Sequence, residues 1–232
     1  MRRDVFPGLA TPFVVAHAGG SVLVGGDIFA GIDCAVGAGI PVVELDVRRT
    51  SDGALVVHHG GRPGERSLAG RRLGELGASV PLLDDVLLHV GGRVAVNLEL
   101  KEAGYEADVL KLALGRVERG RLVVTSFLDD ALRAVRRAAG DVATGLVVGR
   151  RPSLARIAET ISDLSPFRRV QAIDADFLAA SHQLDLVGMR RRAAARGIPL
   201  LLWTVNDPAK LHAALTDRRV LGVVTDNFLV RR

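Results

Sequence analysis

Residues Pro41–Gly60 read PVVELDVRRTSDGALVVHHG, and this stretch combines a strand pattern with an unusual pair of charges. Residues 41–47 are apolar except for Glu44 and Asp46, as in a parallel strand that is buried on both faces. Alternate side chains of a strand leave the same face, so we expect the two carboxylates to lie side by side. Only about five residues, RTSDG, separate this strand from the run ALVVHH, which is too few for a crossover helix. The Asp52-Gly53 pair therefore predicts an antiparallel hairpin.

Short apolar runs recur along the rest of the chain, and most are followed by a segment with a helical pattern. The predicted strands are residues 12–17, 41–47, 93–100, 121–127, 142–148, 169–176, 198–205 and 220–226. The predicted helices are Asp27–Gly37, Asp84–His89, Tyr105–Glu118, Leu128–Ala139, Pro152–Leu164, Gln183–Arg196 and Pro208–Leu215. Their expected N-caps are Asp27, Asp84 and Asp207, while Pro152 and Pro208 suit a first helical turn.

Eight strands with intervening helices in 232 residues predict an α/β protein, a (β/α)8 TIM barrel with a short β-hairpin excursion after strand 2. An open doubly wound sheet is the alternative, although no G-x-G-x-x-G motif follows the first strand to support it. No linker or low-complexity tract interrupts the chain, so we expect residues 1–232 to form a single domain. The hairpin returns His59 to the neighbourhood of Asp46, at the C-terminal mouth where barrel enzymes carry their chemistry.

The composition narrows the classes of partner. The formal charge is +5, which is compatible with a phosphate-bearing substrate, but the arginines are scattered and aromatic residues make up only 4%. This pattern argues against nucleic-acid binding. Cys34 is the single cysteine, which excludes an intramolecular disulfide and a cysteine-based zinc site. No run reaches the roughly 18 apolar residues of a membrane span, and no signal peptide is apparent, so we expect a cytoplasmic protein. The oligomeric state is not indicated.

The paired carboxylates predict a cation site. Two buried like charges on one face are unfavourable without compensation, and a divalent cation such as Mg²⁺ or Ca²⁺ is the simplest partner. Glu99 and Lys101 repeat the spacing at the end of another strand, offering a third carboxylate ligand and a contact for a phosphate oxygen. The alternative is that Glu44 and Asp46 are rim carboxylates paired with the arginines that follow them, and that Glu99 and Lys101 form an exposed edge.

Histidines also fall at strand ends. His17 ends the first strand and His58–His59 end the hairpin, where only one of the two adjacent side chains can face the mouth. Imidazole titrates near neutrality and serves as a general acid or base, although packing or surface roles are the ordinary alternative. Trp203 is either a core anchor or an apolar wall of the pocket. Asn206 and Asp226 each lie near the C-terminal end of a predicted strand and are either rim residues or helix caps, and we favour caps.

Together these motifs resemble the glycerophosphodiester phosphodiesterase family over nearly the whole chain. The corresponding segments are VVAHAGG, VVELDVRRTSDGALVVHHG, NLELK, TSF, LLWTVND and VVTD, in this order. The resemblance implies a (β/α)8 barrel that cleaves a small-molecule phosphodiester with a divalent metal cation. The positions that match the family's functional residues are Glu44, Asp46 and Glu99 for the metal, His17 and His59 for catalysis, and Lys101 and Trp203 for the substrate.

The resemblance implies transfer at phosphorus in which one histidine removes a proton and the other protonates the leaving alcohol, with their assignment open. Attack by an internal hydroxyl, which gives a cyclic phosphate as in a lyase, is one alternative. A catalytically weakened barrel that binds a phosphorylated ligand is another, although binding alone needs no acid-base pair.

Several positions depart from the family pattern. The arginine expected after the first histidine is Ala18, and the aspartate expected after the second is Gly60. Residues 25–28 replace the family's Pro-Glu-Asn-Thr segment, and the proline expected after the terminal Thr-Asp is replaced by Asn227 and Phe228. We therefore expect a divergent member with an altered substrate. Arg48, two residues beyond Asp46, is a hypothetical replacement for the lost charge and a candidate substrate contact. Further charges in the short segment after the hairpin are Arg62, Arg66, Arg71 and Arg72.

Overall fold

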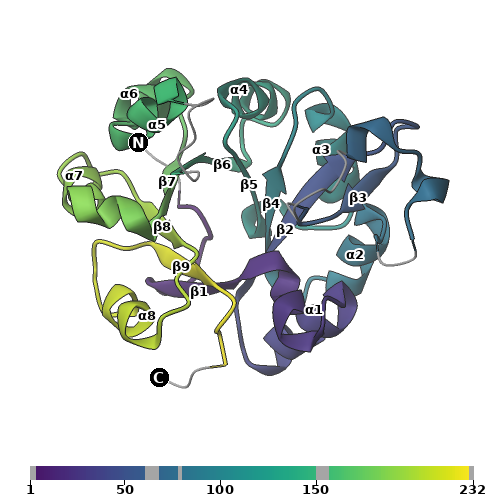
Figure 1. Ribbon diagram of the computed structural model, residues 1–232, viewed down its shortest axis with the longest axis horizontal. Helices are drawn as coiled ribbons and strands as arrows, with labels where there is room; N and C mark the ends of the chain where they lie inside the picture. The colour runs from purple at the N-terminus through teal and green to yellow at the C-terminus, as the bar shows by residue number, and fades with distance from the viewer. Residues whose placement is uncertain (1–3, 61–67, 78–79, 150–156, 230–232) are drawn as a thin grey trace.

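The computed structural model describes residues 4–60, 68–77, 80–149 and 157–229. Within these residues, eight parallel strands close into a barrel surrounded by helices, which confirms the predicted (β/α)8 fold (Figure 1). The strands are β1 Phe13–Ala16, β2 Val42–Arg49, β3 Leu55–Val57, β4 Ala95–Leu100, β5 Leu122–Ser126, β6 Ala143–Val148, β7 Phe177–Ser181, β8 Leu200–Trp203 and β9 Gly222–Thr225. Their order is β1-β9-β8-β7-β6-β5-β4-β2, and pairing of β1 with β2 closes the ring.

The remaining strand, β3, lies outside the ring and pairs antiparallel with the end of β2. Val47 is opposite Val57 and Arg49 is opposite Leu55, so the predicted hairpin is confirmed. β1 pairs with β2 only at Val42 and Val43, near the start of β2. The end of β2, which carries the hairpin, does not pair with β1. The second half of β2 is therefore free to carry the hairpin out of the barrel wall.

The helices of the outer layer follow the strands in chain order. They are α1 Ile28–Gly37, α2 Leu83–Val90, α3 Glu106–Leu114, α4 Asp129–Ala138, α5 Ile157–Leu164, α6 Phe167–Ala172, α7 Met189–Ala194 and α8 Pro208–Leu215. Shorter 3₁₀ turns are η1 His17–Val24, η2 Leu68–Gly70, η3 Leu73–Glu75, η4 Arg119–Arg121 and η6 His182–Val187. The predicted caps Asp27 and Asp207 are confirmed, because their carboxylates accept backbone N–H bonds at the starts of α1 and α8.

One predicted strand is wrong. Residues 169–176 contain most of α6 and the turn after it, and the strand is the next segment, β7. Phe167, Val170 and Ile173 are buried at intervals of three, which is the spacing of one helical face. The true strand reads FLAAS and contains no β-branched residue, so its composition gave little strand signal.

Two helix predictions also differ from the structure, and a third is untested. The predicted helix from residue 183 to 196 is split by Gly188, whose φ of 72° ends η6 before α7 begins. Asp84 lies inside the first turn of α2, whose N-cap is Leu82. Pro152, predicted for a first turn, lies outside the described residues.

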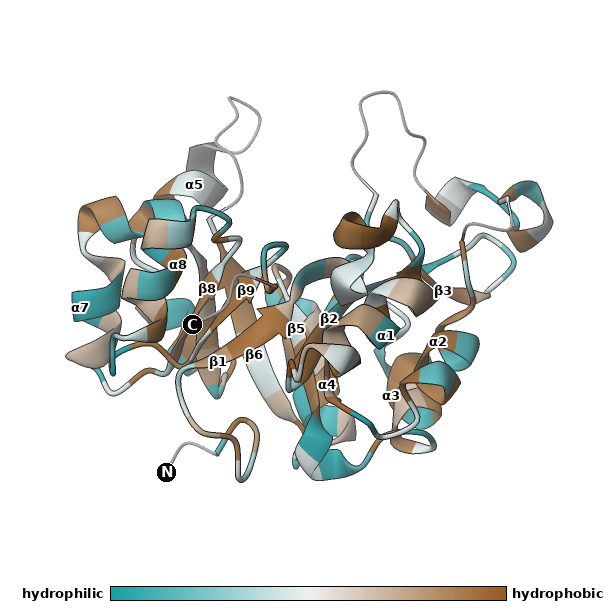
Figure 2. Ribbon diagram, turned by 90° about the horizontal axis from the view of Figure 1, so that it is seen from below, coloured by the Kyte–Doolittle hydropathy of each residue, from teal (hydrophilic) through white to brown (hydrophobic). Residues whose placement is uncertain are grey.

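Alternate residues of the strands fill the barrel. The interior cluster contains Phe13, Val42, Phe177, Val224 and their inward-facing neighbours, and it is capped from below by the N-terminal Val5 and Phe6. The residues between them face the helices, and Figure 2 shows this apolar strand layer running through the centre of the molecule. The same alternation that buries apolar groups low in the barrel brings polar side chains to its upper end.

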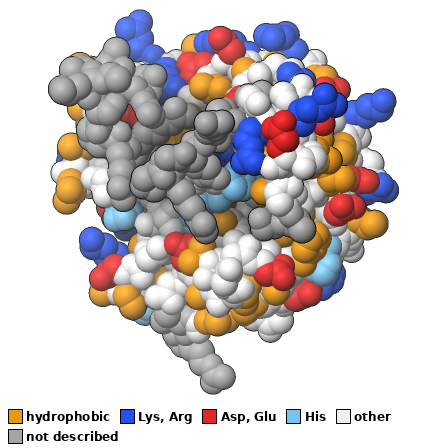
Figure 3. Space-filling view, turned by 45° about the vertical axis from the view of Figure 1, so that its right-hand side comes forward, with side chains coloured by type: hydrophobic (Ala, Val, Ile, Leu, Met, Phe, Trp, Pro, Cys, Tyr) orange, Lys and Arg blue, Asp and Glu red, His pale blue; other side chains and the backbone are white. Residues whose placement is uncertain are grey.

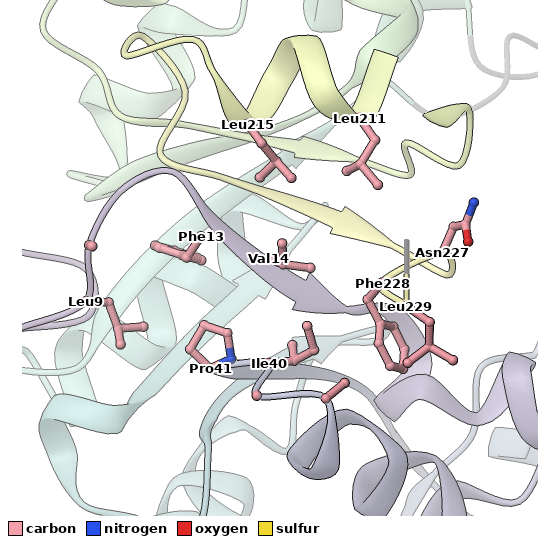
Figure 4. A pocket seen from close by; sticks show the side chains of 13 residues that line it. Leu9, Phe13, Val14, Ile40, Pro41, Leu211, Leu215, Asn227, Phe228 and Leu229 are labelled. Carbon is pink, nitrogen blue, oxygen red and sulfur yellow. The ribbon is translucent and has the colours of Figure 1, made fainter. Parts of the chain in front are cut away.

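A hollow of about 640 Å³ lies outside the barrel, between β1, α8 and the connection from α1 to β2. Figure 4 shows Val14 and Ile40 below Leu211 and Leu215, with Phe228 at the end of the groove. The described residues that line this hollow carry no ionisable side chain.

No single helix among the described residues is long and apolar enough to cross a membrane. Taken together, η1 (His17–Val24) and α1 (Ile28–Gly37) have the length and the apolar composition of a span, but the two helices are bent by 102° relative to each other.

The floor of the barrel depends on a glycine. A Cβ added to Gly145 would lie 2.3 Å from the Phe177 ring, so we expect Gly145→Ala to lower the free energy of unfolding by about 1–3 kcal/mol. Chemical denaturation measures this change. Gly37→Ala is the matched control, because its Cβ would meet no atom within 4 Å and a helical alanine is favourable. Equal stability of Gly145→Ala and wild type would contradict the packing argument.

Candidate active site

Three carboxylates meet at the C-terminal mouth of the barrel. Glu44 and Asp46 extend from β2, and Glu99 extends from β4, where it pairs in register with Asp46. One oxygen of each lies within 4.8 Å of the others. Glu44 and Asp46 are only 3% and 2% exposed, so solvent does little to screen their repulsion. The position of Glu99 opposite Asp46 follows from the parallel register, which sequence spacing did not contain.

Lys101 is the cationic side chain that contacts this cluster. Its ammonium forms ion pairs with Asp46 and Glu99, and its backbone N–H donates to the carbonyl of Val47 (3.2 Å). The cluster also receives one backbone donor, because the N–H of Ala18 bonds Glu44 Oε2 (3.0 Å). Glu44 Oε1 is buried and has no hydrogen-bond partner among the described residues.

Burial and mutual repulsion set the protonation of the cluster. Burial, followed by the charges of Asp46 and Glu99, raises the pKa of Glu44 well above its usual value. Burial also raises the pKa of Glu99, against the opposing effect of Lys101. Burial alone would raise the pKa of Asp46, but the hydrogen bond from His59 and the charge of Lys101 lower it to about 2. Lys101 would lose its proton more easily through burial, yet the carboxylates around it raise its pKa.

The three carboxylates fit a divalent cation. Two oxygens that bind one Ca²⁺ at 2.3–2.6 Å can lie at most about 5 Å apart, and Mg²⁺ also takes carboxylate oxygens. The described cluster meets this limit. Glu44 Oε1 is a buried acceptor without a donor, which is the kind of atom that a bound cation satisfies. The alternative of solvated rim carboxylates is wrong for Glu44 and Asp46, because both are buried.

Two histidines flank the cluster. His17 follows β1 directly, His59 follows β3, and their rings meet edge to face with centroids 4.7 Å apart. His59 Nδ1 bonds Asp46 Oδ2, and this hydrogen bond raises the pKa of His59. His58 precedes it, and its carbonyl accepts from Arg48. The structure therefore brings His59, and not His58, into the cavity lining with His17.

The interpretation of Asn206 and Asp226 as helix caps is wrong. Asp226 Oδ1 bonds His17 Nδ1 (2.7 Å), and Asn206 Nδ2 donates to Asp226 Oδ2 (2.6 Å). The cap of α8 is instead Asp207. Asp226 follows β9 as His17 follows β1, and these strands are neighbours in the closed ring. Asp226 lies two positions after Val224, which faces the barrel interior, so the strand alternation indicated that Asp226 could face the mouth. No sequence pattern indicated its partner, His17, because that residue lies near the other end of the chain.

The cavity between these groups measures about 190 Å³ and has two unlike walls. The wall from β1, β2, β3 and β4 carries the ionisable groups described above. The opposite wall is mostly apolar, and its described residues are Phe127, Val147, Ala179, Leu201, Trp203 and Val224, together with Thr125 and Thr204. Trp203 packs edge to face against Phe127 and donates its indole N–H to the carbonyl of Ala179. In the space-filling view, histidine surface appears near the centre of this face of the molecule (Figure 3).

Arg48 is not among the residues that line this cavity. Its guanidinium forms an ion pair with Glu102 and donates to the carbonyl of His58 (3.2 Å). It therefore braces the segment that carries His59. Beside it, Gly60 lies so close that a Cβ there would be 3.0 Å from the Arg48 guanidinium.

Of the arginines in the segment after the hairpin, Arg71 and Arg72 are described. They contact the carbonyl of Glu75 and the carboxylate of Asp52, respectively, so they brace this segment rather than the cavity. Arg62 and Arg66 lie outside the described residues.

Several solved structures share the fold. A phosphodiesterase from Oleispira antarctica in complex with the product sn-glycerol-3-phosphate superposes with a TM-score of 0.74 at 22% identity, covering 94% of each chain. A glycerophosphodiester phosphodiesterase from Thermotoga maritima gives 0.73 at 24% identity, covering 96% of this chain and 97% of that one. One from Parabacteroides distasonis gives 0.73 at 20% identity, covering 94% of both. At these identities the likeness establishes the fold.

The family is established by sequence. A comparison with curated proteins finds no significant match. The sequence model of the Glycerophosphoryl diester phosphodiesterase family, however, matches residues 29–70 and 63–230, which is most of the chain. The chain therefore belongs to the glycerophosphoryl diester phosphodiesterase family, whose members are phosphoric diester hydrolases.

Proposed function

We propose that this enzyme hydrolyses a glycerophosphodiester-like substrate with a divalent cation, Mg²⁺ or Ca²⁺, held by Glu44, Asp46 and Glu99. The observation that carries this proposal is the convergence of three carboxylate oxygens within 4.8 Å beside two histidine rings. When bound, the cation would neutralise charge on the phosphate oxygens. The Oleispira antarctica phosphodiesterase, solved in complex with the product sn-glycerol-3-phosphate, supports a glycerol phosphate as one part of the substrate.

The chain's own residues supply the remaining steps. Lys101 lies against Asp46 and Glu99, where its ammonium can reach a phosphate oxygen. His17 and His59 each bond a carboxylate through Nδ1, which leaves Nε2 of both rings for the substrate. One Nε2 removes the proton of the attacking water or hydroxyl, and the other protonates the leaving alcohol.

The altered substrate is supported by the two walls of the cavity. Ala18 stands where the family carries an arginine, so that position supplies a methyl group and a backbone N–H in place of a charge. Across the cavity, Trp203 and Phe127 present apolar surface, and none of the described residues that line this wall is charged. An alcohol that buries apolar surface there is stabilised by about 25 cal/mol per Å². We therefore infer that one alcohol of the natural diester is less polar than glycerol.

The first test is hydrolysis of an aryl phosphodiester with added Mg²⁺ or Ca²⁺. We expect activity to disappear after chelation and to return with the cation, because the buried carboxylates need it to bind phosphate.

His17→Ala and His59→Ala should each lower kcat by about 10²–10⁴-fold through loss of proton transfer. His212→Ala, on the exposed face of α8, is the control and should retain full activity. Phosphorus NMR of the products separates hydrolysis from a cyclic phosphate. Activity that survives thorough chelation, or survives His17→Ala, would refute the mechanism.

The second test concerns the apolar wall. We expect Trp203→Ala to raise KM for an aryl diester about tenfold, since loss of roughly 1.4 kcal/mol of binding corresponds to that factor. The KM for glycerophosphoethanolamine should change less, because its alcohols bury little apolar surface. Trp203→Phe keeps an apolar ring and should resemble wild type. Equal effects of Trp203→Ala on both substrates would exclude a selective role for this wall.

Arg48 remains a candidate substrate contact, and its pairing with Glu102 provides the test. We expect Arg48→Ala to lower kcat/KM at least severalfold, because a charge that serves the phosphate or braces His59 is removed. Glu102→Gln frees the guanidinium. A contact to substrate predicts a lower KM in that variant, whereas a purely bracing role predicts a lower kcat. Arg49→Ala, whose partner Asp108 lies on α3, is the matched control. An unchanged kcat/KM in Arg48→Ala would rule out both roles.

A further inference from the structure

The carboxylate of Asp226, which is hydrogen-bonded to His17, has a partner for each of its two oxygens. Asp226 uses one oxygen for His17 Nδ1 (2.7 Å) and the other for Asn206 Nδ2 (2.6 Å). Its backbone N–H donates to Asn206 Oδ1 (2.9 Å), which also accepts from the hydroxyl of Thr225 (3.2 Å). Because its amide oxygen accepts these two bonds, Asn206 must present its NH₂ group to the carboxylate. The carboxylate is therefore fixed in position and in direction.

This arrangement determines the tautomer of His17. Burial alone would raise the pKa of Asp226, but the hydrogen bond from His17 lowers it, so the carboxyl group is ionised and can only accept. The shared proton therefore belongs to His17 Nδ1. In the neutral ring, Nε2 then carries the lone pair, and His17 lines the cavity.

The two histidines differ in their carboxylate partners. The partner of His59 is Asp46, which is 2% exposed and belongs to the carboxylate cluster that fits a cation. Asp226 lies outside that cluster, on β9's end of the barrel mouth. Among the described residues, its side-chain contacts are His17 and Asn206. Of the two imidazoles, Asp226 is hydrogen-bonded to that of His17, whereas His59 is bonded to Asp46.

We propose that Asp226, oriented by Asn206, is a positioning residue for His17: it fixes the Nδ1–H tautomer and stabilises the imidazolium that forms when Nε2 takes up a proton. This inference rests on the proposed function, in which His17 exchanges a proton with the substrate. Asp226 itself does not touch the substrate and acts only through the ring. Asn206 supports it by holding the second oxygen, so its loss should have a smaller effect.

The first experiment uses steady-state kinetics of the cation-loaded enzyme. We expect Asp226→Asn to lower kcat by about 10²–10⁴-fold with KM changed by less than about threefold. The amide keeps the shape but not the charge, and because Asn206 donates to the second oxygen, the new amide turns its own oxygen to Asn206 and its NH₂ group to His17 Nδ1. Asn206→Ala should lower kcat by a smaller factor. Asp207→Asn is the matched control: it lies beside Asn206, caps α8 through the Lys210 N–H and should leave kcat unchanged. A kcat of Asp226→Asn within twofold of wild type would overturn the inference.

The second experiment does not depend on turnover. Two-bond ¹H–¹⁵N NMR of the labelled histidines reports the tautomer of His17 directly; we expect Nδ1–H in wild type and a shift toward Nε2–H in Asp226→Asn. An unchanged tautomer in that variant would overturn the inference even if kcat fell.

A third experiment is a double-variant cycle. In the His17→Ala background, Asp226→Asn should reduce the residual rate no further, whereas a structural role would reduce it in both backgrounds.

The outcomes also separate this inference from the function beneath it. If His17→Ala is inactive while Asp226→Asn retains wild-type kcat, only the positioning role fails. If His17→Ala keeps full activity, the proposed acid-base mechanism fails instead.

Discussion

The repulsion among Glu44, Asp46 and Glu99 is the constraint on which the upper half of the barrel depends. Three carboxylates are brought together by parallel register between β2 and β4, in a place where water screens them little. Lys101, His59 and the backbone N–H of Ala18 compensate this repulsion in part, and Glu44 Oε1 has no donor among the described residues. A buried carboxylate cluster with an unsatisfied acceptor is a poor choice for stability alone, since apolar residues would pack there at lower cost. It is a suitable place for a divalent cation and a phosphate.

The division of the cavity into two walls follows from the order of the strands. His17, Glu44, Glu99 and Lys101 come from the first part of the chain, while Leu201 and Trp203 come from the second. The exception is Asp226, which returns at the end of β9 beside β1 because the barrel closes there. Ring closure thus gives His17 a carboxylate from residue 226, more than two hundred positions away. The ionisable groups are concentrated on one side of the cavity, and the opposite side is mostly apolar.

Many elements of the fold and part of the candidate site could be predicted from the sequence because they depend on local residue patterns. The alternation of Glu44 and Asp46 in an apolar run indicated a strand with two carboxylates on one face, and the short RTSDG link indicated the hairpin. The failures were local too. Residues 169–176 mix apolar and polar positions in a way that suits either helix or strand, and FLAAS lacks the β-branched residues that mark strands.

By itself the sequence determined the number and type of most elements, the inward parity of Glu44 and Asp46, and the resemblance that names the family, because all of these depend on spacing along the chain. Only the tertiary structure decided which residues meet across it. It placed Glu99 opposite Asp46, turned Arg48 toward Glu102, and put Asp226 on His17. These contacts follow from strand register and ring closure, which depend on the packing of the whole barrel and leave no periodic trace in the sequence.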